Sequence, residues 1–275
     1  MSVGPWSYIS LFILSIVALS LSYWKYRNRL LFVQYFAVSG WILFFDYLIY
    51  AWGKAYKYYP KIIKGEFDTH MGALANAQIL PAFAILYIAF QCKWYWGFIF
   101  AGFFTGIEYL FRHLGVFKAN WWEDWYTFVL LVPFFPFCKF WWKGLAWNSK
   151  KWIFFFSLLS VFYVIYTQLN VLLYGVLRLR TIHVEWIERL NRHSTTIMNS
   201  PTGLLFGTIV TFLIISRARS FWYFLTILAF LAFDGCLKVA GIVRTDHIIL
   251  DSLLSFCTFL IPLLTVKYIS NKIKL

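Results

Sequence analysis

The side chains of this chain that could do chemistry are charged groups set inside or beside long apolar runs. Glu108 lies one helical turn before Arg112, and Asp234 lies one turn before Lys238. Each pair would share one face of a helix and could neutralise itself. Asp46 has no such partner in its own run. Because a charge in hydrocarbon costs at least about 2.5 to 3.5 kcal/mol, each of these groups needs either a partner or a wet cavity.

A further pairing opens the last apolar run, where His247 precedes Asp251 by one turn. The two side chains could form a general base with the carboxylate that orients it, or only the hydrogen bond of a helix start. Asp251 has no other partner in its own run. Together these charges predict a polar pocket at one end of the helices. The candidate pocket residues are Asp46, Asp68, His70, Glu108, Arg112, His113, Asp234, Lys238, Arg244, His247 and Asp251.

The sequence contains no complete set of residues for a metal site or a disulfide framework. Histidines and carboxylates are numerous enough for zinc or a hard cation, but there is no HExxH motif and no tight carboxylate cluster. The cysteines lie within or at the ends of apolar runs and form no CxxC pair; they are Cys92, Cys138, Cys236 and Cys257. We therefore expect no metal, no cofactor and small buried cysteines.

Composition decides the class of protein. Apolar residues make up 61% of the 275 residues and charged residues only 13%, compared with about 45 to 50% and about 25% in soluble domains. Several runs of nearly membrane-spanning length contain no charge. The net charge of +14 comes from basic residues near the ends of these runs, where they attract anionic lipid, so nucleic acid is not an expected partner. We predict an all-α polytopic membrane helix bundle.

The apolar runs predict about eight to nine transmembrane helices in a single membrane domain, residues 1–275, because no sequence repeat or linker divides the chain. The segment at about 178–200 is polar and spaces its apolar residues as a helix does, which predicts a short interfacial helix. Ser200 and Pro201 would then cap and begin the next span. The expected spans are about residues 5–24, 30–52, 70–91, 95–114, 126–142, 152–176, 201–216, 221–242 and 247–266.

The distribution of charge predicts the orientation in a cell membrane. With alternating spans, one side holds short basic loops and no acidic residue, while the other side holds every acidic residue. Short basic loops favour the cytoplasmic side, so we expect an extracytoplasmic N-terminus and a cytoplasmic C-terminus. Tryptophan prefers the headgroup level of a bilayer. We expect interfacial anchors on the extracytoplasmic side at Trp121, Trp122 and Trp125.

The last third of the chain is similar in layout to the membrane phosphatidate phosphatases. The sequence SPTGL at residues 200–204 is followed by one span, a basic turn, a second span and then R-x-x-H-x-x-x-D from Arg244 to Asp251. That superfamily carries two catalytic motifs in this order on its outer face. Leu204 stands at the position of its proton-donor histidine, and Thr202 at the position of its serine. The resemblance therefore implies a member without the usual catalysis.

The middle of the chain resembles an uncharacterised family of small multi-pass membrane proteins of spore-forming Gram-positive bacteria. The shared features are D-x-x-x-G-A at residues 68–73, I-E-Y-L-F at 107–111, L-G-V-F at 114–117, the tryptophan pair at 121–122 and Tyr-Thr at 126–127. The resemblance implies a bacterial multi-pass membrane protein and supplies no activity.

Two functions are compatible with these patterns. The first is a non-enzymatic membrane protein of the cell envelope, whose extracytoplasmic polar rim binds membrane lipid headgroups or a membrane protein partner. The second is a membrane-embedded enzyme or carrier that acts on a lipid-like or anionic substrate from the outer leaflet. Its anion contacts would be arginines, namely Arg112, Arg178, Arg180 and Arg244. The lack of a complete catalytic set favours the first function, and enzymatic activity is left open.

Overall fold

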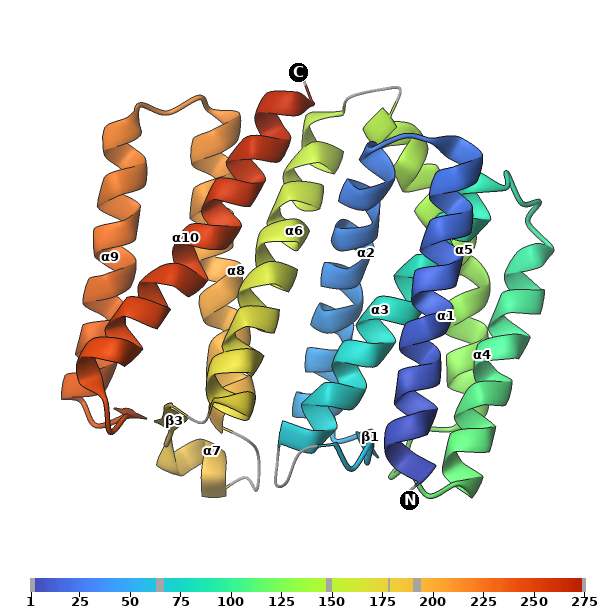
Figure 1. The fold of residues 1–275 in the computed structure, drawn as a ribbon, viewed down its shortest axis with the longest axis horizontal. Helices are drawn as coiled ribbons and strands as arrows, with labels where there is room; N and C mark the ends of the chain where they lie inside the picture. Colours follow the sequence, from blue (N-terminus) through green and yellow to red (C-terminus); the bar gives the residue numbers. More distant parts are fainter. Residues whose placement is uncertain (1–2, 63–66, 147–149, 178, 190–193, 274–275) are drawn as a thin grey trace. The chain divides into compact units, whose positions relative to one another are not determined.

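The computed structural model describes residues 3–62, 67–146, 150–177, 179–189 and 194–273 of the chain. Helices dominate these ranges (Figure 1). The α-helices are α1 (Val3–Tyr26), α2 (Leu30–Asp46), α3 (Phe67–Ala89), α4 (Trp96–His113), α5 (Asp124–Ala146), α6 (Lys151–Val171), α7 (Glu185–Arg189), α8 (Ser194–Ile215), α9 (Ser220–Val239) and α10 (Ile248–Lys272). Two of them continue as a π-helical turn, α2 into η1 (Tyr47–Trp52) and α6 into η2 (Leu172–Val176).

Within the described ranges, eight helices are long and apolar enough to cross a membrane: α1, α2 with η1, α3, α5, α6, α8, α9 and α10. The remaining long helix, α4, has 18 residues and carries Glu108, Arg112 and His113, which lower its mean hydropathy. Many large apolar side chains are exposed on the helices, including Phe12 and Phe212, as on surfaces that face lipid. The predicted fold class, an all-α polytopic membrane helix bundle, is confirmed.

The described residues divide into two compact units, residues 1–154 and 155–275. In the first unit α3 packs against α1, α2 and α5, and α4 packs against α5. Phe135 of α5 is fully buried, with its ring 5.9 Å from that of Tyr87 in α3 and 5.2 Å from that of Phe100 in α4. Aromatic side chains therefore build the core of this unit as well as its surface. The single membrane domain expected over residues 1–275 stays a prediction.

In the second unit α9 and α10 pack together, and both contact α8. Phe230 of α9 stacks on Phe259 of α10 with ring centroids 4.5 Å apart. Phe162 of α6 and Phe206 of α8 meet Phe259 edge-on, each at 5.8 Å. One buried ring thus joins all four long helices of the unit.

Helix α8 begins earlier than expected. It starts at Ser194, so Pro201 lies inside the helix and Ser200 is not its cap. Ile197 and Ser200 are both buried, and the Ser200 hydroxyl hydrogen-bonds that of Tyr163 in α6. Burial of this extra turn outweighs the single helical hydrogen bond that a proline removes. The expected interfacial helix is reduced to α7, and residues 190–193 of that segment lie outside the described ranges.

The two units repeat one architecture, although no sequence repeat was expected. Each runs from a helix with a π-helical turn into a short strand, two long helices, a second strand and a final helix. Strand β1 (Tyr56–Tyr58) pairs antiparallel with β2 (Phe117–Ala119), and β3 (Thr181–Ile182) pairs antiparallel with β4 (Val243–Arg244). Helix α1 precedes the first repeat, which comprises α2 to α5, and α7 is inserted in the second, which comprises α6 to α10.

The turns that end α4 and α9 are the same in detail. Gly115 and Gly241 follow these helices in the left-handed conformation, at φ of 66° and 72°. Each glycine N–H donates to the carbonyl of a basic residue three positions earlier, Arg112 or Lys238, and the next N–H donates to the residue before that one. This arrangement is a Schellman turn, in which glycine avoids the strain of a Cβ. It ends each helix just after a basic residue and directs the chain into the second strand.

The strand registers also match. In each pair the last residue of the first strand lies opposite the first residue of the second strand. The residues that follow, Tyr59 and His183, each donate their N–H across the pair at 2.8 Å. Tyr58 and Ile182 are therefore equivalent, and two positions before them stand Tyr56 and Arg180.

The close approach of β1 to α3 gives a direct test of the first repeat. A Cβ added to Gly72 would lie 2.3 Å from the Cβ of Tyr58, an atom next to the backbone of β1. We expect Gly72→Ala to lower the free energy of unfolding by about 1 to 3 kcal/mol, because the strand must move away from the helix. Thermal unfolding of the purified protein in detergent measures this change. Gly102→Ala in α4, where a Cβ would meet nothing within 4 Å, is the matched control, and an equal loss there would contradict this packing.

Candidate functional site

The first unit places one arginine between two carboxylates. The Arg112 guanidinium lies 3.3 Å from Glu108 on its own helix and 2.9 Å from Asp124, in the first turn of α5. Arg112 also donates to the carbonyl of Trp122 at 2.8 Å. The predicted pair of Glu108 and Arg112 is confirmed, and the sequence did not show its third member. We call Glu108, Arg112 and Asp124 the first triad.

Glu108 accepts hydrogen bonds from both Arg112 and Thr127. The indole N–H of Trp122 donates to the Thr127 hydroxyl at 2.8 Å, and an indole nitrogen can only donate. The single hydroxyl hydrogen of Thr127 is then directed to Glu108 Oε2, while Arg112 donates to Oε1. Both oxygens of Glu108 therefore act as acceptors in this arrangement. With one cation and two carboxylates, the first triad carries a net charge of −1.

Asp46 lies in the same unit, at the end of α2, and is 6% exposed. The Tyr56 hydroxyl of β1 donates to its Oδ1, so Asp46 has a partner from outside its own apolar run. Its partner comes from a strand that the sequence did not predict. Oδ2 is buried and has no hydrogen-bond partner within the described ranges. Asn76 of α3 and Tyr58 of β1 also lie close enough to act on this carboxylate.

The tyrosines of β1 complete the surroundings of Asp46. Burial raises the pKa of Tyr56 and of Tyr58 well above the ordinary value for tyrosine, and the negative charge of Asp46 raises both further. Both hydroxyls therefore stay protonated and can donate. The charge of Glu108 also acts on Tyr56, so Tyr56 faces both Asp46 and the first triad.

The second unit contains an equivalent triad. Lys238 of α9 lies 2.8 Å from Asp234 on its own helix and 2.7 Å from Asp251 in the first turn of α10. Its third hydrogen is donated to the Ser252 hydroxyl at 2.9 Å. The predicted pair of Asp234 and Lys238 is confirmed. We call Asp234, Lys238 and Asp251 the second triad, because each member occupies the position of its counterpart in the first.

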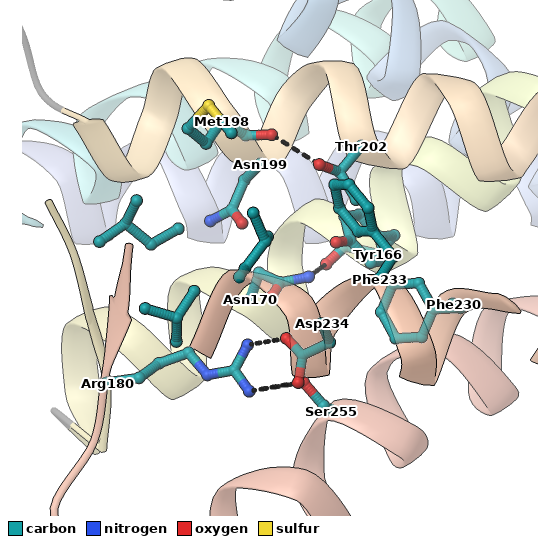
Figure 2. Close-up of a pocket in the computed structure, with 13 residues that line it drawn as sticks. Tyr166, Asn170, Arg180, Met198, Asn199, Thr202, Phe230, Phe233, Asp234 and Ser255 are labelled. Atoms are coloured by element: carbon teal, nitrogen blue, oxygen red, sulfur yellow. Dashed lines mark hydrogen bonds and ion pairs between the residues drawn. The ribbon is translucent and has the colours of Figure 1, made fainter. Parts of the chain in front are cut away.

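The second triad has a fourth member, Arg180, which enters from the residue before β3. Its guanidinium donates to Asp234 at 3.0 Å, to both oxygens of Asp251 and to the Ser255 hydroxyl at 2.6 Å. Figure 2 shows it reaching Asp234 beside Ser255. Asp251 is thus held by two cations, both from outside its own apolar run. With two cations and two carboxylates, this cluster is neutral.

A small cavity adjoins the second triad. Its volume is about 20 Å³, the space of about one water molecule. Polar side chains from α6 and α8 face it, including Asn170 and Asn199, along with Arg180 and Asp234 (Figure 2). Phe230 and other apolar side chains close the remaining walls. A site this small and neutral accommodates water but has no room for a lipid headgroup.

Four of the other candidate residues lie outside the two triads. Asp68 accepts from the backbone N–H groups of Lys61 and Ile62, both at 2.7 Å, and so fixes the chain before α3. His70 is buried, with its ring 6.1 Å from that of Tyr50. His113 and Arg244 are exposed. None of these joins either triad in the interactions that the structure describes.

The base that His247 and Asp251 could have formed is not present among the interactions that the structure describes. His247 is exposed, and its backbone carbonyl, not its imidazole, accepts from the Asp251 N–H at 2.9 Å. The imidazole and the carboxylate are not joined, because the Asp251 side chain is directed to Arg180 and Lys238 in the interior. Of the expected anion contacts, Arg112 and Arg180 are each bound to carboxylates, and Arg178 lies outside the described ranges.

An aromatic wall stands beside the first triad, formed by Trp121, Trp122, Trp125 and Tyr126. Neighbouring rings in this wall are 4.2 to 5.9 Å apart. Trp121 and Trp125 are exposed, while Trp122 is buried and belongs to the hydrogen bonds of the triad. The expected interfacial anchors thus include one residue of the candidate site itself.

Removal of Arg180 tests the charge balance of the second triad. We expect Arg180→Gln to lower the free energy of unfolding by about 3 to 5 kcal/mol, because two buried carboxylates then share one cation. Adding Asp251→Asn removes the excess charge and should recover part of the loss. Arg112→Gln should cost less, because the Arg112 side chain is 26% exposed and that of Arg180 only 3%. Denaturant unfolding in detergent measures all three, and equal losses for the two arginine variants would contradict the difference in burial.

Comparison of this chain with known proteins found no matching family model, no matching curated protein and no matching solved structure. The function is therefore inferred from the residues of the chain itself.

Proposed function

We propose that this chain is a non-enzymatic, multi-pass integral membrane protein of the cell envelope that binds a lipid headgroup at the first triad. The observation that carries this proposal is the difference in exposure between the two triads. The side chains of Arg112 and Asp124 are 26% and 32% exposed, whereas those of Arg180 and Asp251 are 3% and 1% exposed. The first site is accessible from outside the protein, and the second is closed.

The surroundings of the first triad support a headgroup as its ligand. Exposed tryptophans such as Trp121 and Trp125 lie beside it, and tryptophan is enriched at the headgroup level of bilayers. The site therefore stands where a lipid presents its polar end. Helices α1 and α3 begin, and α2 and α4 end, at the same end of the first unit as β1 and β2 (Figure 1). We place this end on the extracytoplasmic side, because the loops expected at the other end are short and basic.

The bonding of the charges supports binding over catalysis. Each carboxylate of the two triads lies within 3.3 Å of a basic side chain and is neutralised at least in part by it. The exposed His247 does not reach the carboxylate that would orient it as a base. These groups hold helix ends together and present a fixed pattern of charge.

Retention of lipid tests this function. After purification in mild detergent, native mass spectrometry of the wild-type chain should show bound lipid. The double variant Glu108→Gln, Asp124→Asn should retain about tenfold less, which corresponds to a loss of about 1.4 kcal/mol of binding free energy. Glu185→Gln is the control, because Glu185 is an exposed acid in α7 that pairs only with Arg189 in the described interactions.

Two results would speak against headgroup binding. Equal lipid retention by the wild type and the double variant would show that the first triad does not bind lipid. Loss of a co-purifying protein in the double variant, with lipid unchanged, would assign the site to a protein partner.

A further inference from the structure

The two repeats contain the same charged triad with different numbers of cations. In both, a basic residue bridges the acid one turn before it and an acid in the first turn of the next helix. In the second repeat Arg180 supplies another cation from the first strand. By the strand register, the corresponding residue of the first repeat is Tyr56. The first repeat therefore has the carboxylates of this site without its second cation.

The carboxylates around the first triad outnumber its cation by more than one. The first triad alone carries −1, and Asp46 adds a carboxylate whose Oδ2 has no hydrogen-bond partner in the part of the chain that the structure describes. Both Asp46 and Glu108 act on Tyr56, the residue in the place of Arg180. The hydroxyl of Tyr56 supplies one hydrogen bond to Asp46 but no charge. A group carrying positive charge and N–H donors would complete the site as Arg180 completes the other.

The side chains around the first triad match one class of cation. Aromatic rings attract ammonium groups through their negative faces, and the wall of Trp121, Trp122, Trp125 and Tyr126 lies beside Asp124. A metal ion is less suitable, since no group of three potential metal ligands is found in the described ranges.

We propose that the first triad binds an alkylammonium group, which takes the role that the Arg180 guanidinium has in the second repeat. This inference rests on the proposed headgroup function and specifies the charge of the ligand. The ammonium N–H groups donate to Asp124 and Glu108 at their exposed side, and the aromatic wall covers the alkyl part. Two sources can present this group, an ethanolamine lipid or a free amine.

Thermal unfolding of the full-length protein distinguishes these sources. The unfolding temperature would be measured in three preparations: nanodiscs of phosphatidylethanolamine with phosphatidylglycerol, nanodiscs of phosphatidylglycerol alone, and detergent-solubilised protein with added ethanolamine. We expect a higher unfolding temperature with phosphatidylethanolamine or with ethanolamine. A rise with both means that free amine suffices, and a rise with the lipid alone means that the bilayer presents the group. Glu108→Gln and Asp124→Asn should each weaken the ethanolamine or lipid dependence at least about tenfold.

Tyr56→Arg provides a positive test, because it gives the first repeat the arginine of the second. This variant should unfold at the same temperature with or without the ammonium probe, since its own guanidinium fills the site. Glu185→Gln should respond as the wild type does. If Tyr56→Arg does not fold, the two carboxylate variants still decide the matter.

The outcomes separate this inference from the proposed function. Lipid binding that depends on the first triad but shows no preference for an ammonium probe would overturn the ammonium inference and leave headgroup binding intact. Unfolding temperatures that are the same in every lipid and in every variant would overturn both. An ammonium effect that persists undiminished in Glu108→Gln and Asp124→Asn would place the ligand elsewhere on the protein.

Discussion

The structure depends on one electrostatic constraint, that a carboxylate withdrawn from water must be matched by a cation close to it. Removing an ion from water costs several kcal/mol even after the protein relaxes, and only a well-placed partner offsets this cost. The chain meets the constraint twice in the same way. Arg112 and Lys238 stand at the last turn of a helix, and each joins its own helix to the start of the next. The Schellman turns after these residues bring the next helix back into reach.

Because both units contain this triad, the residues around it can be compared position by position. The second unit adds Arg180 and becomes neutral and closed, with room for about one water molecule in its cavity of about 20 Å³. The first unit has Tyr56 in that position, keeps Asp46 nearby and leaves Asp124 partly exposed. The second triad therefore joins α9 to α10 with its charges balanced. The first triad has unmatched negative charge beside the aromatic wall. The proposed binding site lies in the repeat whose negative charge is unmatched.

Much of the fold was readable from the sequence, because long apolar runs and their basic ends report directly on membrane helices. The pairs of Glu108 with Arg112 and of Asp234 with Lys238 were also readable, since residues four apart on a helix share a face. The third members of the triads were not, because Asp124 and Asp251 reach them only after a turn and a strand of two or three residues. Such short strands have no periodicity that a sequence pattern could reveal.

The repeat itself was hidden because the two units conserve shape and not residue type. Tyr56 and Arg180 occupy one position but differ in type. Identical residues are found only at separate points, such as Gly115 and Gly241 in the turns and Asp124 and Asp251 in the triads. The start of α8 was misplaced for a related reason: Pro201 reads as a helix start locally, while burial of Ile197 continues the helix before it. Tertiary packing decided both positions.

The sequence predicts that all acidic residues lie at one face of the membrane, and this requires α4 to cross it despite its charges. Labelling with a membrane-impermeant thiol reagent tests this most directly, using single cysteines at Lys57 of β1 and Arg244 of β4, both exposed, in a chain without its native cysteines. Arg219→Cys, between α8 and α9, marks the opposite face. We predict that the first two sites label in intact cells and the third only after permeabilisation. Labelling of positions 57 and 244 from opposite faces would contradict the prediction of a single acidic face.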